Sequence, residues 1–241
     1  PADLLTDPTP ETVAELIAAG RGAVKMVTIA PERPGAMDAV AQLAEAGVVV
    51  AVGHTDVDFD ACRAAIEAGA RGATHLFNAM APLRHREPGP VLALWEDPRV
   101  HLELIMDGVH VRPELVAFVM ASAPGRVVLV TDAMGAACAD DGDYVLGTLP
   151  VEVRDGVARI AGTDTIAGST LTLDQAVRRC VATGVGLAAA VGAATAVAAD
   201  YLGLTDVGRL APGKRADLVV LDDDLQVTRV MRRGRWVPAS A

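Results

Sequence analysis

The chain has 241 residues, of which 51% are hydrophobic and only 3% aromatic, enough for one large core or a core with an appendage. A formal net charge of −10 with no basic stripe argues against nucleic acid or a membrane as a partner. No run of eighteen apolar residues and no signal peptide occur, and the three widely spaced cysteines indicate reduced thiols, so the sequence predicts a globular cytoplasmic protein.

Five apolar runs rich in Val, Ile and Leu are expected to form strands. They span residues 23–30, 47–53, 72–77, 100–106 and 126–133. Between them lie stretches such as 35–47 and 59–70, with Ala and Leu at helical spacing and a glycine just past the end. A repeat of about 25 residues per strand and helix, with strands apolar on both faces, is typical of a parallel sheet wrapped by helices.

The pattern changes after Asp132. The stretch "DYVLGTLPVEVRDGVARIAG" predicts short antiparallel strands, because its Asp-Gly pair is a hairpin signal. Helices then return through about Leu204, and the Ala-rich stretch 186–199, which is broken by glycines, favours a helical pair over a membrane span. The tail from residue 213 contains three brief apolar runs, which predict the strands of a small β unit.

Reactive side chains follow four of the five expected strands, and the first strand is followed by "APE" with Glu32. In barrels and open α/β sheets the carboxyl ends of parallel strands are where ligands bind. Singly, each residue has an ordinary explanation: a histidine as a cap or core residue, the aspartate as a turn cap, and Glu32 as a turn or salt-bridge residue. Jointly, three histidines and an aspartate at one rim exceed what core packing requires. The side chains are His54, His75, His110 and Asp132, and Asp107 accompanies His110.

Two neutral imidazoles on adjacent strands, His54 and His75, are nitrogen donors that suit zinc or iron. The carboxylate of Asp132, two strands further on, can take a proton from water whose pKa such an ion lowers. The constellation therefore predicts metal-assisted hydrolysis.

Six motifs occur in an order and at distances that resemble N-acetylglucosamine-6-phosphate deacetylases of the amidohydrolase superfamily. They are "GHTD", "THLFNAM", "HREPG", "DGVHV", "VTDA" and "AGSTLT", and the resemblance runs from about residue 8 to the end. "THLFNAM" followed by "REPG" is specific to that family, whereas a lone histidine after a strand would indicate only the superfamily. The resemblance implies removal of the N-acetyl group from N-acetylglucosamine 6-phosphate, giving glucosamine 6-phosphate and acetate.

The same resemblance implies a role for each matching residue. His54 and His75 would hold a divalent metal ion, with zinc expected and iron or another divalent ion as the alternative, and Asp132 would be the general base and acid. In similar enzymes an arginine reaches the substrate across a dimer interface, which implies a homodimer. The substrate-binding groups would be Asn78, the Ala79 backbone, Arg86 and His110, with the backbone at Ala167 and Gly168 lining the sugar pocket.

The sequence departs from the family in one respect. Family members carry a metal-binding glutamate in an "HLEGP" motif, a histidine soon after it, three more barrel strands and more of a small β domain, none of which is found here. A complete barrel of this type needs about 250 residues for itself. We therefore expect an incomplete (β/α)8 TIM-type barrel of about the last five strand–helix units, plus part of a small β-sandwich domain. Activity is expected only with the N-terminal part, and Glu32 does not match the missing ligand.

The expected domains are a partial metal-dependent hydrolase barrel over residues 1–205, with a β-hairpin insertion at about 143–161, and C-terminal strands of the small β domain over 206–241. Two other functions stay open. A cyclic-amide hydrolase or deaminase of the same superfamily would share the histidines and Asp132 but would not need the phosphate-binding set. A truncated, non-catalytic chain would account for the absent glutamate.

Overall fold

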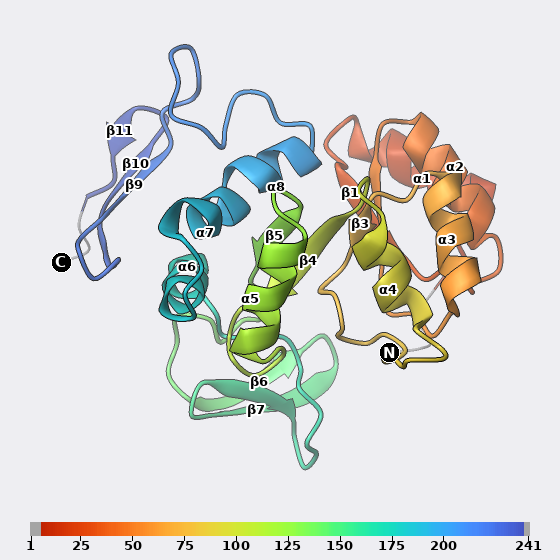
Figure 1. Cartoon of the computed structure of the whole chain (residues 1–241), viewed down its shortest axis with the longest axis horizontal. Coiled ribbons are helices and arrows are strands. Elements are labelled where there is room, and N and C mark those ends of the chain that lie inside the picture. The colour runs from red at the N-terminus through yellow and green to blue at the C-terminus, as the bar shows by residue number, and fades with distance from the viewer. Residues whose placement is uncertain (1–5, 239–241) are drawn as a thin grey trace. The chain divides into compact units, whose positions relative to one another are not determined.

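Four parallel strands and the helices between them form the first part of the chain (Figure 1). In this computed structural model, which describes residues 6–238, the strands β1 to β4 lie side by side in chain order. Consecutive helices pack together, α1 on α2, α2 on α3 and α3 on α4. The elements are α1 (Pro10–Gly20), β1 (Met26–Ile29), α2 (Ala36–Glu45), β2 (Val49–Val52), α3 (Phe59–Ala68), β3 (Gly72–Ala73), α4 (Gly89–Glu96) and β4 (His101–Ile105).

Local signals set the limits of these helices. The carboxylate of Asp58 accepts a hydrogen bond from the Ala61 N–H at 2.8 Å and caps the start of α3, and Gly69 with φ of 126° follows its last residue. Gly47, with φ of 72°, lies one residue further on, after Ala46 at the end of α2. The helices and strands of this part bury large side chains completely, each contributing about 1.5–3 kcal/mol of hydrophobic stabilisation; they include Leu43, Ile66 and Leu94 of the helices and Val50, Val52 and Leu102 of the strands.

The third strand is shorter than the sequence predicts. The apolar run 72–77 predicts a strand of six residues, but β3 ends at Ala73. The chain leaves the sheet because His75, Phe77 and Ala79 all have positive φ angles, of 31°, 80° and 48°. Such backbone cannot continue a β-ladder, so His75 lies in a turn after the strand.

A second compact unit begins at Ile105, and the first ends at Leu104. It contains the fifth strand of the series, β5 (Val127–Val130), which contacts three of the unit's helices, α6 (Leu173–Ala182), α7 (Leu187–Ala194) and α8 (Ala196–Tyr201). The helix α5 (Pro113–Ser122) precedes β5. The Ala-rich stretch therefore forms the predicted helical pair, α7 and α8. Within residues 6–238 no helix is long and apolar enough to cross a membrane.

The predicted hairpin region forms a separate antiparallel sheet of β6 (Gly142–Leu146), β7 (Leu149–Arg154) and β8 (Val157–Ile160). Arg154 pairs with Val157 across a two-residue turn, whose residues Asp155 and Gly156 have φ angles of 51° and 72°. Two positive φ angles are the signature of a type I′ turn, which matches the right-handed twist of the strands. The Asp-Gly signal in the sequence is thus confirmed.

The tail forms three antiparallel strands, as predicted: β9 (Leu218–Leu221), β10 (Val227–Arg232) and β11 (Arg235–Trp236). The predicted α/β class, with the parallel strand–helix units of a partial TIM-type barrel, is confirmed. The division at residues 205 and 206 stays a prediction. Residues 1–5 and 239–241 of the predicted domains lie outside the described residues.

The three cysteines, Cys62, Cys138 and Cys180, are free thiols. Burial raises the pKa of Cys62 to about 12 and that of Cys180 to about 11, because the low-polarity interior disfavours the thiolate. Both buried thiols are therefore unreactive packing residues at neutral pH.

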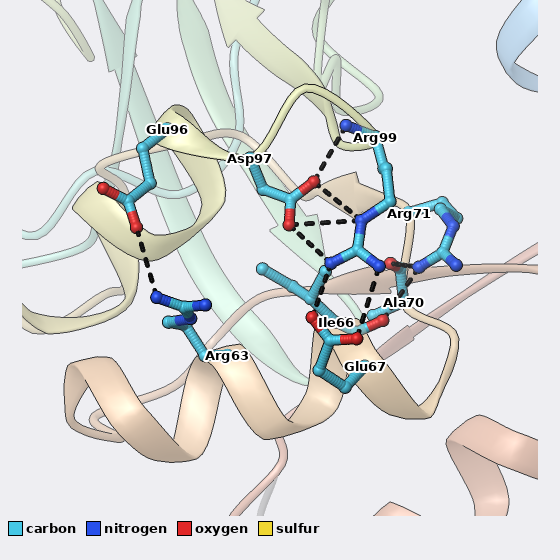
Figure 2. Close-up of polar contacts among 8 residues, drawn as sticks. All are labelled: Arg63, Ile66, Glu67, Ala70, Arg71, Glu96, Asp97 and Arg99. Carbon is cyan, nitrogen blue, oxygen red and sulfur yellow. Dashed lines mark hydrogen bonds and ion pairs between the residues drawn. The ribbon is translucent and has the colours of Figure 1, made fainter.

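An ion-pair cluster joins the end of α3 to the segment before β4 in the first unit (Figure 2). Arg99 donates to the Asp97 carboxylate from Nη2 at 2.7 Å and from Nε at 3.0 Å, and to Glu67 from Nη2 at 2.7 Å. Arg71 donates to the Ile66 and Ala70 carbonyl oxygens at 2.8 and 2.7 Å, which satisfies acceptors at the C-terminus of α3. These contacts lie at the ends of the strands opposite to the histidines, so we assign them to stability.

Replacing Asp97 with Asn is expected to lower the free energy of unfolding at neutral pH by about 1 kcal/mol, since Arg99 is 41% exposed and solvent screens the pair. Hydrogen bonds from Arg99 lower the pKa of Asp97 from 3.8 to about 2. Because the pKa of Asp97 is lower in the folded state, its ionised carboxylate stabilises the fold above pH 3.8, and this contribution is lost as the pH falls toward 2.

Urea denaturation of both chains across this pH range measures the difference, which should shrink toward pH 2. The Glu114→Gln variant is the control, because its ion pair with Arg112 is mostly exposed and should contribute little. A difference between parent and Asp97→Asn that stays constant with pH would mean that the charge of Asp97 is not what stabilises the fold.

Candidate active site

Two imidazoles meet just beyond β2 and β3 in the first unit. Nε2 of His54 lies 2.9 Å from Nε2 of His75, and the ring planes are inclined at 73°. His75 is 7% exposed, whereas His54 faces solvent. Both residues have positive φ, 51° and 31°, a region that side chains with a Cβ adopt at a cost of about 1–2 kcal/mol. Such strain concentrates at functional sites.

The spacing of this pair suits two neighbouring ligand positions of one metal ion. With bonds of about 2.0–2.1 Å, two nitrogens 2.9 Å apart subtend about 90° at the ion, and a shift of a few tenths of an ångström reaches the tetrahedral angle. The donor chemistry therefore fits zinc or another divalent ion. Among residues 6–238 no group of three or more His, Cys, Asp or Glu side chains is arranged to hold a metal, and the role of the pair as ligands stays a prediction.

Thr55, directly after His54, connects the loops that follow three strands. It is 2% exposed, its N–H donates to the Ala79 carbonyl at 2.9 Å, and its own carbonyl accepts from the Ala81 N–H at 3.0 Å. Its hydroxyl donates to the Glu32 carboxylate at 2.5 Å. Glu32 lies in a turn, as one of the two sequence interpretations predicts, and its carboxylate also accepts hydrogen bonds from the loop of His54.

The pKa of Glu32 reflects these contacts. Partial burial opposes ionisation, but hydrogen bonds from the Thr55 hydroxyl and the Asp56 N–H outweigh it, so the pKa of the carboxyl is lowered. Glu32 is thus an anion at neutral pH.

The loop after β3 carries Asn78 and Ala79. The Asn78 side-chain amide donates to the His75 carbonyl at 3.1 Å, and the Ala79 carbonyl accepts from Thr55. The described contacts therefore assign both residues to holding the turn of His75, and binding of substrate by them stays a prediction.

Arg86 lies on the exposed loop that precedes α4, in the first unit. It lines a cavity of about 570 Å³ together with Arg84, Asp58 and Glu87. A second cavity of about 330 Å³ is lined by His54, Thr55 and Ala79, and Asp56 belongs to both. His54 and the loop of Arg86 thus border neighbouring cavities.

Asp107 and His110 form a pair in the second unit. The Asp107 carboxylate lies 2.6 Å from Nδ1 of His110 and accepts the N–H groups of Val109 and His110 at 2.8 and 2.9 Å. Burial opposes ionisation of Asp107, but the hydrogen bonds from His110 prevail and lower its pKa. The contact occupies Nδ1 of His110 and leaves Nε2 for a ligand.

Asp132 follows β5 with φ of 49°, and its side chain is exposed. Its carbonyl accepts from the Ser169 N–H at 2.8 Å, and the buried Ser169 hydroxyl donates to the Thr131 carbonyl. Gly168 passes so close that a Cβ there would lie 3.1 Å from the Asp132 oxygen. The second unit therefore brings Ala167 and Gly168 beside Asp132.

The predicted residues fall into two groups. His54, His75, Asn78, Ala79 and Arg86 belong to the first unit. The second unit holds His110, Asp132, Ala167 and Gly168. The roles of all of them, and the convergence of Asp132 with the histidines, stay predictions. Thr55 and Ser169 are not among the residues predicted from the sequence, although each motif, "GHTD" and "AGSTLT", places a hydroxyl beside a predicted site residue.

The amidohydrolase family profile matches residues 6–237. The chain is 43% identical over 223 residues to N-acetylgalactosamine-6-phosphate deacetylase of Escherichia coli O157:H7, covering 92% of this chain and 59% of the relative. It is 37% identical over 238 residues to N-acetylglucosamine-6-phosphate deacetylase of Lysinibacillus sphaericus, covering 98% and 61%. The chain spans about three fifths of the length of these relatives.

Solved structures show the same relationship. A mutant of N-acetyl-D-glucosamine-6-phosphate deacetylase from Mycobacterium smegmatis, in complex with N-acetyl-D-glucosamine-6-phosphate, is 52% identical with a TM-score of 0.93. That match covers 98% of this chain and 63% of the solved chain. The enzyme from Thermotoga maritima is 38% identical with a TM-score of 0.85, covering 91% and 60%.

Proposed function

This chain belongs to the amidohydrolase family, and we propose that it forms part of a deacetylase that hydrolyses N-acetylglucosamine 6-phosphate to glucosamine 6-phosphate and acetate. The observation that supports this chemistry is the histidine pair, because two imidazole nitrogens 2.9 Å apart at strand ends suit two neighbouring ligand positions of one metal ion. The similarity to deacetylases over nearly the whole chain supports the substrate class.

In this mechanism His54 and His75 hold a divalent ion, for which we propose zinc, with iron as the alternative. Such an ion, when bound, supplies Lewis acidity for attack of water on the amide carbonyl. Asp132 accepts the proton of the attacking water and returns it to the leaving nitrogen, so that the amide bond breaks to acetate and a free amine. Proton transfer of this kind contributes about 10²–10⁴-fold to the rate.

Substrate recognition in the proposal uses the phosphate and the sugar. His110, with Nδ1 held by Asp107, offers Nε2 to the substrate, while the backbone at Ala167 and Gly168 lines the sugar pocket. Arg86 would bind the phosphate across a homodimer interface, and its exposure on a loop is compatible with that role. In this proposal the protein is cytoplasmic and takes part in amino-sugar catabolism.

Deacetylation of N-acetylgalactosamine 6-phosphate is a second candidate, because the relative with 43% identity acts on that sugar by its name. The two substrates are epimers, so the same metal and proton chemistry serves both. Acetate release from each sugar phosphate by the complete gene product distinguishes them. Release from neither would disprove both candidates.

In the same assay the Arg86→Ala variant tests phosphate recognition. Loss of a hydrogen bond to a charged group costs about 1.5–3 kcal/mol, so we expect kcat/KM for the phosphorylated sugar to fall by about 10- to 100-fold. The rate with unphosphorylated N-acetylglucosamine should change little. Arg63→Ala is the matched control, since Arg63 is an exposed arginine of α3 paired only loosely with Glu96 at 3.9 Å. An equal loss on both sugars would make Arg86 a structural residue.

A further inference from the structure

Glu32 lies just beyond β1, and both oxygens of its carboxylate bond to the residues that follow His54. Oε2 accepts from the Thr55 hydroxyl at 2.5 Å, and Oε1 accepts from the Asp56 N–H at 3.0 Å. The adjacent Arg33 instead pairs with Asp7 at 2.6 Å. Within residues 6–238 the Glu32 carboxylate forms no ion pair, so its described contacts serve this loop.

Thr55 carries this restraint onward to the loop of His75. Its N–H donates to the Ala79 carbonyl, its carbonyl accepts from the Ala81 N–H, and it forms a parallel bridge with Met80. The residue is 2% exposed, so each of its polar groups needs a partner within the protein. One buried threonine therefore ties the segment after β2 to the segment after β3.

The restraint acts on backbone that would not hold its shape alone. His54, His75 and Ala79 have φ angles of 51°, 31° and 48°, and a non-glycine residue leaves this region unless neighbouring contacts hold it there. The imidazoles keep their Nε2 separation of 2.9 Å only while both turns persist.

We propose that Glu32 is a positioning residue, which acts through Thr55 to hold the imidazoles of His54 and His75 in the arrangement that binds a metal ion. This inference rests on the proposed function, because that function makes the two histidines metal ligands. Glu32 itself does not reach the ion in this role. It sets the geometry of the ligands, as partners behind metal ligands do in other sites.

The test measures Zn²⁺ binding to the complete gene product by NMR titration of the histidine ring resonances, with Co²⁺ absorption as a second signal of ligand geometry. Glu32→Ala should weaken Zn²⁺ binding by about 10- to 100-fold. Glu32→Gln should restore most of it, because the amide oxygen still accepts from Asp56 and the amide group can bond the Thr55 hydroxyl. If Glu32 contributed only to overall stability, Glu32→Gln would not restore the Co²⁺ absorption spectrum of the parent protein.

Thr55→Val removes the hydroxyl and nearly keeps the shape, and should weaken binding as Glu32→Ala does. The double variant should bind Zn²⁺ no more weakly than either single variant, because both changes remove the same hydrogen bond between Thr55 and Glu32. Asp7→Ala is the matched control: it removes a carboxylate bonded to the same turn, at Arg33, and should leave Zn²⁺ binding unchanged.

Amide hydrogen exchange gives a readout that needs no metal. In Glu32→Ala the amides of Thr55 and Ala81 should exchange faster, while the Ala61 amide at the start of α3 should not. If Glu32→Ala keeps the Zn²⁺ affinity and the amide exchange rates of the parent, the positioning role is wrong, whereas the metal assignment is unaffected. If the parent chain binds Zn²⁺ no better than His54→Asn, the metal assignment of the proposed function fails and the positioning role falls with it.

Discussion

Replacing Asp132 with Asn in the complete gene product is expected to lower kcat for acetate release by about 10²–10⁴-fold, with a small change in KM. The amide of Asn cannot take a proton from water at neutral pH, whereas the shape of the side chain is nearly kept. Asn is also tolerated at the φ of 49° found here, where Ala would add strain.

The backbone around Asp132 should survive this substitution. Ser169 and Gly168 approach the carbonyl of Asp132 and not its side chain, so the variant should keep the parental thermal midpoint. Asp164→Asn, at an exposed aspartate of the same unit, is the control and should retain parental kcat. A parental kcat in Asp132→Asn would remove Asp132 from the mechanism.

Replacing either histidine of the pair is expected to have the second large effect. His54→Asn and His75→Asn should each lower the affinity for Zn²⁺ by more than about 100-fold, since loss of a partner behind the ligand already costs about 10- to 100-fold. Asn again suits the positive φ at both positions, of 51° and 31°. Competition with a chromophoric chelator, on the complete gene product, measures the affinity.

His85→Asn is the matched control, because His85 is an exposed histidine on the loop before α4. Its Zn²⁺ affinity should equal that of the parent. Unchanged affinity in both His54→Asn and His75→Asn would rule out the pair as the metal site, and acetate release that survives in them would rule out the proposed chemistry.

Local order along the chain was largely encoded in local sequence. Helices α2 and α3 end where glycines follow them, and the turn at Asp155 and Gly156 forms where the Asp-Gly pair predicts it. Periodicity, caps and turn residues act over a few positions, so they can be read without the rest of the molecule. For the same reason the sequence indicated which side chains follow which strand.

Contacts between distant residues depended on the tertiary structure. Thr55 bonds to Glu32 across 23 positions and Ser169 to Thr131 across 38, and no local pattern specifies either partner. The early end of β3 has the same origin, because the positive φ angles at His75 and Ala79 are held by hydrogen bonds from neighbouring segments, such as that from Thr55 to Ala79.

Local sequence patterns are enough to predict the strand–helix order, the hairpin turn and the positions of His54, His75, His110 and Asp132 after strands. The tertiary structure adds that the Nε2 atoms of His54 and His75 lie 2.9 Å apart and that the Glu32 carboxylate bonds to the two residues after His54. The physical reason is that a strand end fixes where a side chain starts, whereas its final direction depends on backbone torsions. Hydrogen bonds from residues far away in the sequence set those torsions here.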